Sequence, residues 1–363
     1  MTVERLDVSV YTIPTREPES DGTLAWDRTT VVVVEAVSGT VTGLGFSYAT
    51  PACATLIHDV LESVVVGSDP MDVPGTWQAM VDAIRNLGRP GVVSMAIAAV
   101  DTALWDLKAR LLQLPLARLL GMVRRSVPVY GSGGFTSLPL DELTRQLSGW
   151  VHADGIPRVK MKIGLSGGRR PGDDVERVAA VRCAIGNDAD LYVDANGAYT
   201  AKVALRTARH MADEGVSWFE EPVSSDDLAG LRHVRDATAV DVAAGEYGYD
   251  LAYFGRMCSA GAVDVLQADV SRCAGITEWL RAAAVASANG LQISGHTAQS
   301  LHAHPACAVP NLRHLEYFSD HARVDRLLFD GVLEPVEGRL TPDLSRPGMG
   351  LDLKHSDARA YRV

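Results

Sequence analysis

The sequence predicts an α+β domain followed by a (β/α)8 barrel, and three observations point to this fold. Before about residue 125, long strand-like segments are followed by helical ones, whereas short strand and helix patterns alternate after it. Eight such short apolar strands can be counted in the second part. Several of them end on an ionisable residue, as happens where parallel barrel strands meet at the active face.

The composition is that of a folded globular protein. Of 363 residues, 47% are hydrophobic and 22% are charged, which excludes a disordered chain, and the length favours two folding units. A net charge of −11 and the absence of long Lys/Arg clusters argue against a nucleic-acid partner. No uncharged apolar stretch reaches the roughly 20 residues of a membrane span, and the start lacks the basic head of an export signal. We therefore expect a cytoplasmic protein without a membrane partner.

Residues 1–125 are predicted to form the α+β domain. The segments RLDVSVYTI, TTVVVVEAV and VTGLGFSY are typical of an antiparallel meander with turns at SG and TG. From Ser94 to Leu120, apolar residues recur every three or four positions, which predicts a helix or a helix pair broken at Pro115. The turn-rich tail, residues 331–363, is expected to return to this domain because it cannot add to a closed barrel.

Residues 126–330 are predicted to form the barrel. Its strands are expected at VPVYG, RVKMKIG, DLYVDAN, WFEEP, DVAAGE, VDVLQADV, LQISGH and RHLEYF. Near-continuous apolar strands separated by helices predict a parallel sheet covered on both faces, and eight units favour a closed barrel over an open sheet. Thr200, and Ser224 or Ser225, are the expected N-caps of two of the helices.

Three carboxylates are predicted to bind one Mg²⁺ per subunit. Asp194, Glu220 and Glu246 lie at the ends of consecutive strands and are spaced 26 residues apart each time. Brought together above a barrel they would repel one another unless a hard dication held them, and three oxygen ligands leave positions for water or substrate. The alternative is that each acid separately caps the helix that follows it. Glu221 must point to the other side of its strand.

Two lysines and a histidine are the candidate acid/base groups. Lys160 and Lys162 lie two residues apart in a buried strand and so point the same way. Burial near a dication should lower the pKa of a lysine, so we predict Lys162 as the base and Lys160 as the group that holds the substrate carboxylate or tunes its neighbour. Asp269, one strand before His296, can fix the tautomer of that histidine. Other histidines lack such a partner and are predicted to be structural: His302, His304 and His314.

These residues, taken in order, resemble the enolase superfamily and its mandelate racemase subgroup. The motifs are KMK, DAN, EEP and GE at the second to fifth strands, with an Asp at the sixth and a His at the seventh. The segment DTALWDLKARLLQLPLARLLG also resembles the family's entry into the barrel. The resemblance covers essentially the whole chain and implies a capping domain, built from both termini, over a modified (β/α)8 TIM-type barrel.

The resemblance also implies roles for single residues. Asp194, Glu220 and Glu246 would bind Mg²⁺, and Asp269 would pair with His296. Lys162 and His296 would act as acid/base groups on opposite faces of the substrate. Two further residues are assigned to the substrate by the same likeness: Glu316, which would hydrogen-bond an enediolate, and Asn196, which would lie near the substrate.

The predicted reaction is Mg²⁺-dependent abstraction of the proton α to a carboxylate, which gives an enediolate intermediate. We predict a carbon–oxygen lyase, an acid sugar dehydratase that forms a 2-keto-3-deoxy acid. The alternative is a racemase or epimerase of a 2-hydroxy acid using the same Lys/His pair. A cycloisomerase is less favoured, because its usual lysine at the sixth strand is replaced by Asp269. A barrel that binds acids without turnover is the remaining hypothesis.

The capping loops, Thr15 to Arg28 and Phe46 to Thr55, are expected to select the small-molecule carboxylate substrate. Neither loop carries an obvious clamp for a second carboxylate, which favours a monoacid sugar over a diacid. A homo-oligomer is expected, since enzymes of this type are often symmetric assemblies.

Overall fold

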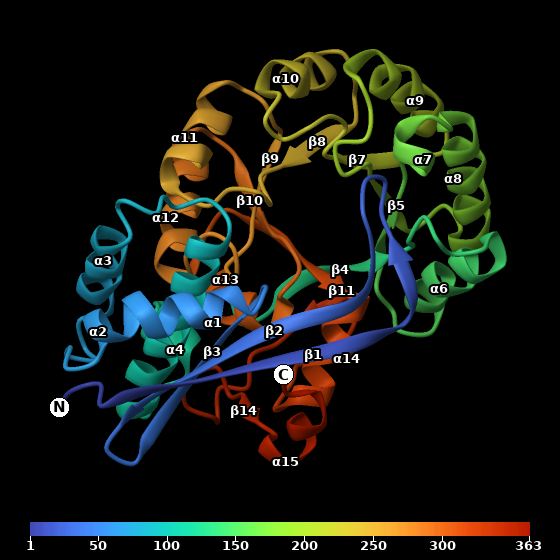
Figure 1. Cartoon of the computed structure of the whole chain (residues 1–363). Coiled ribbons are helices and arrows are strands. Elements are labelled where there is room, and N and C mark those ends of the chain that lie inside the picture. The colour runs from blue at the N-terminus through green and yellow to red at the C-terminus, as the bar shows by residue number, and fades with distance from the viewer.

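A three-stranded antiparallel sheet opens the chain in the computed structural model, which describes residues 1–363 (Figure 1). Its strands are β1 (Arg5–Ser20), β2 (Ala25–Ser38) and β3 (Val41–Tyr48), paired in that order. The tip of the β1–β2 hairpin reaches over the barrel towards β5 and β7 (Figure 1). The meander predicted from the sequence is confirmed.

The helices of the first unit follow the sheet. They are α1 (Ala52–Leu56), a π-helical turn (Ile57–Leu61), α2 (Glu62–Val65), α3 (Val73–Ala83), α4 (Val92–Leu111) and α5 (Leu116–Leu119). The predicted break at Pro115 is confirmed: this residue has an extended backbone (ψ 139°) and separates α4 from α5. No helix of the protein combines the length and the apolar character needed to cross a membrane.

Both faces of β2 are buried, which explains its run of four valines. Val31 and Val33 belong to the core that continues into the barrel, whereas Val32 and Val34 belong to the core beneath α3 and α4. Because successive side chains of a strand point to opposite faces, this alternation places the sheet between the helices and the barrel.

The predicted turn at TG is wrong, because Thr42 and Gly43 lie inside β3. The hairpin turn is at Gly39, which has φ 60°. Gly43 and Gly45 are instead required by packing: a Cβ at Gly45 would lie 2.2 Å from the carbonyl oxygen of Ala99 in α4. The missing side chains let the helix rest directly on the strand.

Eight parallel strands form the closed barrel. They are β4 (Val127–Gly133), β5 (Arg158–Lys162), β6 (Asp190–Asp194), β7 (Val216–Glu220), β8 (Asp241–Ala244), β9 (Val265–Ala268), β10 (Gln292–Gly295) and β11 (Leu312–Phe318). Each pairs with its neighbour in sequence, and β11 pairs with β4 to close the ring. The predicted barrel is confirmed.

Helices surround the strands (Figure 1). They are α6 (Leu140–His152), α7 (Leu165–Gly168), α8 (Pro171–Ile185), α9 (Ala201–Asp213), α10 (Leu228–Asp236), α11 (Leu251–Ser259), α12 (Ile276–Ala288), α13 (Gln299–Ala308) and α14 (Ser319–Leu328). Thr200 is the N-cap of α9 but its side chain makes no capping hydrogen bond. The expected serine cap of α10 is wrong: Asp227 accepts from the backbone N–H of Gly230 at 2.8 Å, because the two serines lie in the preceding turn.

The tail contacts both units. It contains β12 (Phe329–Asp330), β13 (Arg339–Leu340), β14 (Asp352–Leu353), α15 (His355–Ala358) and a 3₁₀ turn (Arg359–Tyr361). The backbone N–H of Val363 donates to the carbonyl of Val10 in β1 at 3.0 Å. The expectation that the tail adds nothing to the barrel sheet is wrong: β13 pairs with β4 at Val127 and Pro128, ahead of the residues that pair with β11. We propose residues 1–125 with 331–363 as one domain and 126–330 as the other.

Candidate active site

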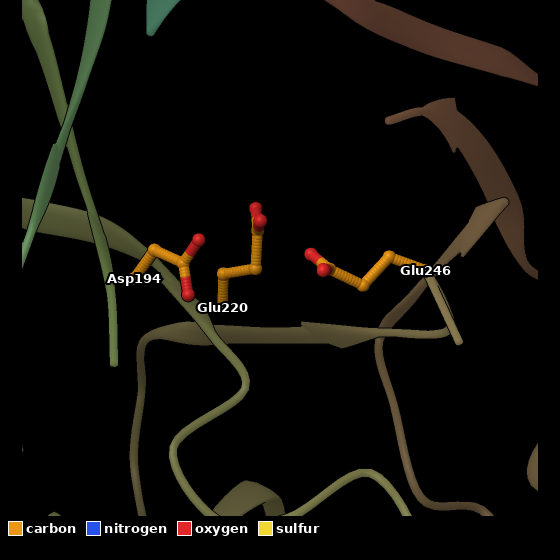
Figure 2. Close-up of side chains that lie close together, drawn as sticks. All are labelled: Asp194, Glu220 and Glu246. Carbon is orange, nitrogen blue, oxygen red and sulfur yellow. The ribbon is translucent and has the colours of Figure 1, made fainter. Parts of the chain in front are cut away.

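The three strand-end carboxylates converge at one end of the barrel (Figure 2). Asp194 ends β6, Glu220 ends β7 and Glu246 follows β8 by two residues. All three are buried, and one ligand oxygen from each lies within 4.8 Å of the others. Glu246 Oε2 has no hydrogen-bond partner in the protein. An all-carboxylate donor set with an unsatisfied oxygen fits a hard dication such as Mg²⁺.

Lys160 lies beneath this cluster, completely buried among carboxylates. Its Nζ contacts Glu220, lies 2.9 Å from Glu316 Oε1 and 3.4 Å from Asp194 Oδ2. Burial lowers the pKa of Lys160, but the charges of Glu220 and Glu316 outweigh that effect and raise it, so the ammonium group stays charged. Lys160 is not among the residues that line the reaction cavity described below.

Lys162 comes from the same strand and does line the cavity. Its Nζ donates a hydrogen bond to Asp194 Oδ2. The charges of the protein alone do not produce the fall in pKa that was expected for Lys162 near a dication. Burial lowers the pKa of Lys162, but the carboxylate of Asp194 more than offsets this and raises it. A dication held by Asp194 would weaken this offset, because it would compete with the ammonium group for the same negative charge.

His296 follows β10 and faces Asp269, which follows β9. Its Nδ1 lies 2.9 Å from Asp269 Oδ2, so Nδ1–H donates and Nε2 is left facing the carboxylate cluster. Nε2 lies 3.2 Å from Glu246 Oε2 without hydrogen-bond geometry. Burial raises the pKa of Asp269, but the hydrogen bond and charge of His296 lower it overall, so the carboxylate stays ionised.

Glu316 of β11 is fully buried, and like Lys160 it is not among the cavity-lining residues. Its Oε1 accepts from Ser132 Oγ at 2.5 Å, and its Oε2 accepts from the backbone N–H of Thr297 at 2.9 Å. Glu316 Oε2 lies 3.9 Å from His296 Nε2. Burial raises the pKa of Glu316, but the charge of Lys160 lowers it overall.

A cavity of about 350 Å³ opens above these groups. Lys162, His296 and Asn196 line it from the barrel, and both expected loops line it from the other unit, through residues such as Trp26 and Tyr48. Asn196 has the left-handed φ of 46° and its Oδ1 has no partner. The loops therefore lie where substrate selection requires them.

Sequence reasoning missed Arg272, which also lines the cavity. Its NH1 lies 3.2 Å from Glu246 Oε1, its Nε lies 3.6 Å from Asp269 Oδ2, and its guanidinium covers the ring of Tyr247. The only signal in the sequence was a basic residue three positions after Asp269. Asp320 and His321, after β11, also line the cavity and carried no distinguishing motif.

The remaining buried histidines are structural, as predicted. His302 Nε2 accepts from the backbone N–H of Val270 at 3.0 Å, and His304 Nδ1 accepts from that of Ala117 at 3.1 Å. His314 lies inside the barrel against the ring of Tyr130. Their imidazoles satisfy buried backbone or pack against aromatic rings, away from the cavity.

Family models match both parts of the chain. Residues 7–121 match the mandelate racemase/muconate lactonizing enzyme N-terminal domain, and residues 142–358 match the enolase C-terminal domain-like model. The chain belongs to the mandelate racemase/muconate lactonizing enzyme family of the enolase superfamily. The resemblance inferred from the strand-end motifs is thereby confirmed.

Two characterised relatives of this family member are close in sequence. A 3,6-anhydro-α-L-galactonate cycloisomerase of Streptomyces coelicolor is 34% identical over 86% of this chain and 88% of its own length. The L-talarate/galactarate dehydratase of Salmonella typhimurium is 31% identical over 98% of this chain and 90% of its own length.

Two solved structures share the whole fold. A mandelate racemase/muconate lactonizing enzyme-like protein from Rubrobacter xylanophilus is 54% identical, with a TM-score of 0.96 and complete coverage of both chains. A racemase from Streptomyces coelicolor, solved with bound magnesium, is 31% identical, with a TM-score of 0.93, over 99% of this chain and 100% of its own. Magnesium in that relative agrees with the donor set of Asp194, Glu220 and Glu246.

Proposed function

We propose that the protein is a Mg²⁺-dependent acid sugar dehydratase, and one observation carries this proposal. Lys162 and the Asp269-oriented His296 line the same small cavity, beside three carboxylates suited to a dication. A base and an acid on the two sides of one bound molecule can remove a proton from one carbon and assist a leaving group on the next. Several related sequences carry dehydratase names, including arabinonate and D-galactonate dehydratases.

In this proposal Lys162 takes the proton from carbon 2 of the acid. The electron pair moves onto the carboxylate and gives an enediolate. It then forms the double bond between carbons 2 and 3 as the bond from carbon 3 to its hydroxyl oxygen breaks. His296 gives the Nε2 proton to that hydroxyl, which leaves as water. The enol then takes a proton at carbon 3 and loses the proton of its carbon-2 hydroxyl, and the product is a 2-keto-3-deoxy acid.

Other residues hold charges in place for this reaction. Mg²⁺ bound by Asp194, Glu220 and Glu246 would supply positive charge where the substrate carboxylate becomes more negative. Lys160, held in the cluster, keeps a second fixed cation beside that point. Asp269 keeps the proton on His296 Nδ1, so that only Nε2 exchanges protons with the substrate. We assign Asn196 to a substrate contact, and Glu316, which does not line the cavity, to holding Lys160 and the backbone N–H of Thr297 in place.

Cycloisomerisation is the second candidate, which changes the order expected from the sequence. A relative with 34% identity is named a 3,6-anhydro-α-L-galactonate cycloisomerase, and another with 29% identity a D-galactarolactone cycloisomerase. Asp269 at the sixth strand was therefore too weak a reason to rank cycloisomerases below racemases and epimerases. The same two acid/base groups would serve this reaction.

A cytoplasmic location and a homo-oligomer remain predictions.

The first test is a screen of mono- and diacid sugars with Mg²⁺ in D₂O. A keto-acid assay detects dehydration, while proton NMR detects deuterium at carbon 2 and isomerised products. Keto-acid formed only when Mg²⁺ is present is the expected result. Deuterium incorporation or an isomer without keto-acid would instead assign an isomerase.

His296→Asn separates the two proton-transfer groups. We expect this variant to lose keto-acid formation by about 10²- to 10⁴-fold, the usual contribution of one acid/base group. Lys162-dependent exchange of the carbon-2 proton with D₂O should persist, because Lys162 and the carboxylate cluster are intact. Loss of exchange together with dehydration would show that His296, and not Lys162, removes the proton.

A further inference from the structure

A second cavity, of about 680 Å³, lies beside the reaction cavity. Its walls come from the loops after β6, β7 and β8 and from α11, and Thr23 at the β1–β2 hairpin tip closes it from the other unit. Asn196 and Tyr247 line both cavities. Because Asn196 is two residues past Asp194 and Tyr247 is next to Glu246, the second cavity begins beside the carboxylate cluster.

The wall of this cavity holds unsatisfied acceptors. Glu221 is only 1% exposed, yet its Oε1 has no hydrogen-bond partner in the protein, and neither has Asn196 Oδ1. Both residues adopt left-handed backbone angles, φ 39° and φ 46°. An unpaired buried acceptor destabilises the folded state, and backbone positions strained in this way concentrate at binding sites. Glu221, which the sequence places on the other side of its strand from Glu220, therefore lines a wall that requires a donor.

The other residues that line this cavity indicate which kind of ligand supplies the hydrogen-bond donor. Tyr247, Tyr249 and Tyr253 supply aromatic faces and hydroxyl groups. Asp226 and Asp250 carry negative charge, whereas Arg256 is the single cation among the lining residues. This excess of negative charge disfavours a carboxylate there, while hydroxyl groups can donate to the acceptors and the carbon chain can pack on the rings.

We propose that this cavity is a subsite for the neutral, polyhydroxylated end of the substrate, which reaches it between Asn196 and Tyr247. The inference deepens the proposed function and rests on it: the acid end lies at the carboxylate cluster and the neutral end in the second cavity. It assigns the substrate class as long-chain monoacid sugars (aldonates), in preference to the matching aldarates. An aldarate would bring its second carboxylate towards Asp226 and Asp250.

The test compares one aldonate with the aldarate of the same configuration, using the full chain with Mg²⁺. The wild type should have the lower KM for the aldonate. Asp226 is exposed at the cavity rim and makes no ion pair, so Asp226→Asn and Asp226→Arg can change the charge without disturbing the core. Each one-unit change of charge, from Asp to Asn and from Asn to Arg, should raise the aldarate-to-aldonate ratio of kcat/KM by about 2- to 5-fold. This is the size expected for one partly exposed charge interaction.

The matched controls are Asp213→Asn and Asp213→Arg, which make the same charge changes on an exposed residue of α9. They should leave the ratio unchanged. An aldarate preference in the wild type, or a ratio that Asp226 variants do not move, would overturn the subsite.

Calorimetry separates this inference from the dehydratase proposal. Lys162→Ala, checked for folding by circular dichroism, should still bind the aldonate more tightly than the aldarate. Adding Asp226→Arg to Lys162→Ala should reduce or reverse the difference in Kd between the two acids. If this holds while the wild type forms no keto-acid and exchanges no proton, the subsite stands and the dehydratase proposal fails. If the wild type turns over both acids but binding shows no such preference, the subsite fails alone.

Discussion

At the scale of single residues, the active site is a network of buried charges that compensate one another. Lys160 contacts three carboxylates, and Lys162 and Arg272 each pair with a carboxylate that would hold the metal. Buried charges are tolerated only when paired, so the same contacts that position the reactive groups also keep the barrel mouth folded. Removing one partner should therefore cost stability as well as activity.

Lys160→Met tests this directly. In chelator-treated protein we expect the free energy of unfolding to fall by about 3–5 kcal/mol, because Glu220 and Glu316 lose their buried counter-charge. Urea unfolding followed by circular dichroism measures the change. Lys202→Met, at an exposed position of α9 without an ion pair, is the control and should change stability by less than about 0.5 kcal/mol. Equal effects of the two variants would refute the compensation argument.

At the scale of elements, the contact between β3 and α4 decides how the first unit is built. α4 is buried over much of its surface, between the sheet and α12. Gly43 and Gly45 remove the side chains that would hold the helix away from the strand. Asp106 of α4 then accepts from the backbone N–H of Leu44 at 2.8 Å, and that of Met349 also donates to it. One helix thus ties the sheet and the tail together.

Gly45→Ala should destabilise the protein by about 1–3 kcal/mol, since the new Cβ would lie 2.2 Å from a backbone oxygen that cannot move aside. Gly149→Ala is the matched control: it lies within α6, where an added Cβ meets nothing within 4 Å. That change should stabilise the protein by about 0.5–1 kcal/mol, because alanine favours the helix. Thermal melting of both variants gives the comparison, and a neutral Gly45→Ala would contradict the packing argument.

At the scale of the whole molecule, segments far apart in sequence meet around the barrel. The β1–β2 hairpin tip reaches over the barrel (Figure 1) and lines the cavity through Asp21 and Leu24, and the C-terminal residue pairs with β1. His304 of α13 accepts from the backbone N–H of Ala117 in α5, so it links the barrel to the segment that enters it. Burial lowers the pKa of His304 to about 4.

His304 should make the fold sensitive to acid. Its pKa is lower in the folded protein than its ordinary value of 6.5, so the unfolded chain binds more protons between pH 6.5 and about 4. Stability from this group is therefore present above pH 6.5 and is lost as the pH falls, by about 1.4 kcal/mol per pH unit. His302, His314 and His321 also have lowered pKa values. His304→Gln should therefore reduce the slope of the unfolding free energy, measured by urea unfolding across that range, by the contribution of this one group. His210→Gln, at an exposed position of α9, should leave the slope in place.

Sequence reasoning reached the barrel, its eight strands and the strand-end residues because each of these is encoded locally. Apolar runs with helical segments between them define a closed parallel barrel, and the last residue of each strand necessarily faces its mouth. Boundaries and caps were less accurate: the TG pair was taken for a turn, and the cap of α10 was assigned to serine, because both depend on what packs nearby. Arg272 was missed for the same reason, since its partners come from two different strand ends.

By itself, then, the sequence determined the order of the elements, the family and the acids and bases that end the barrel strands. Only the tertiary structure decided how their charges combine. Lys162 was expected to have a lowered pKa, but its contact with Asp194 raises it. The second cavity, with Glu221 unpaired in its wall, likewise exists only once three loops and the hairpin tip are assembled. Local pattern determines which groups are present, whereas distance and burial, which set electrostatic energies, arise only from packing.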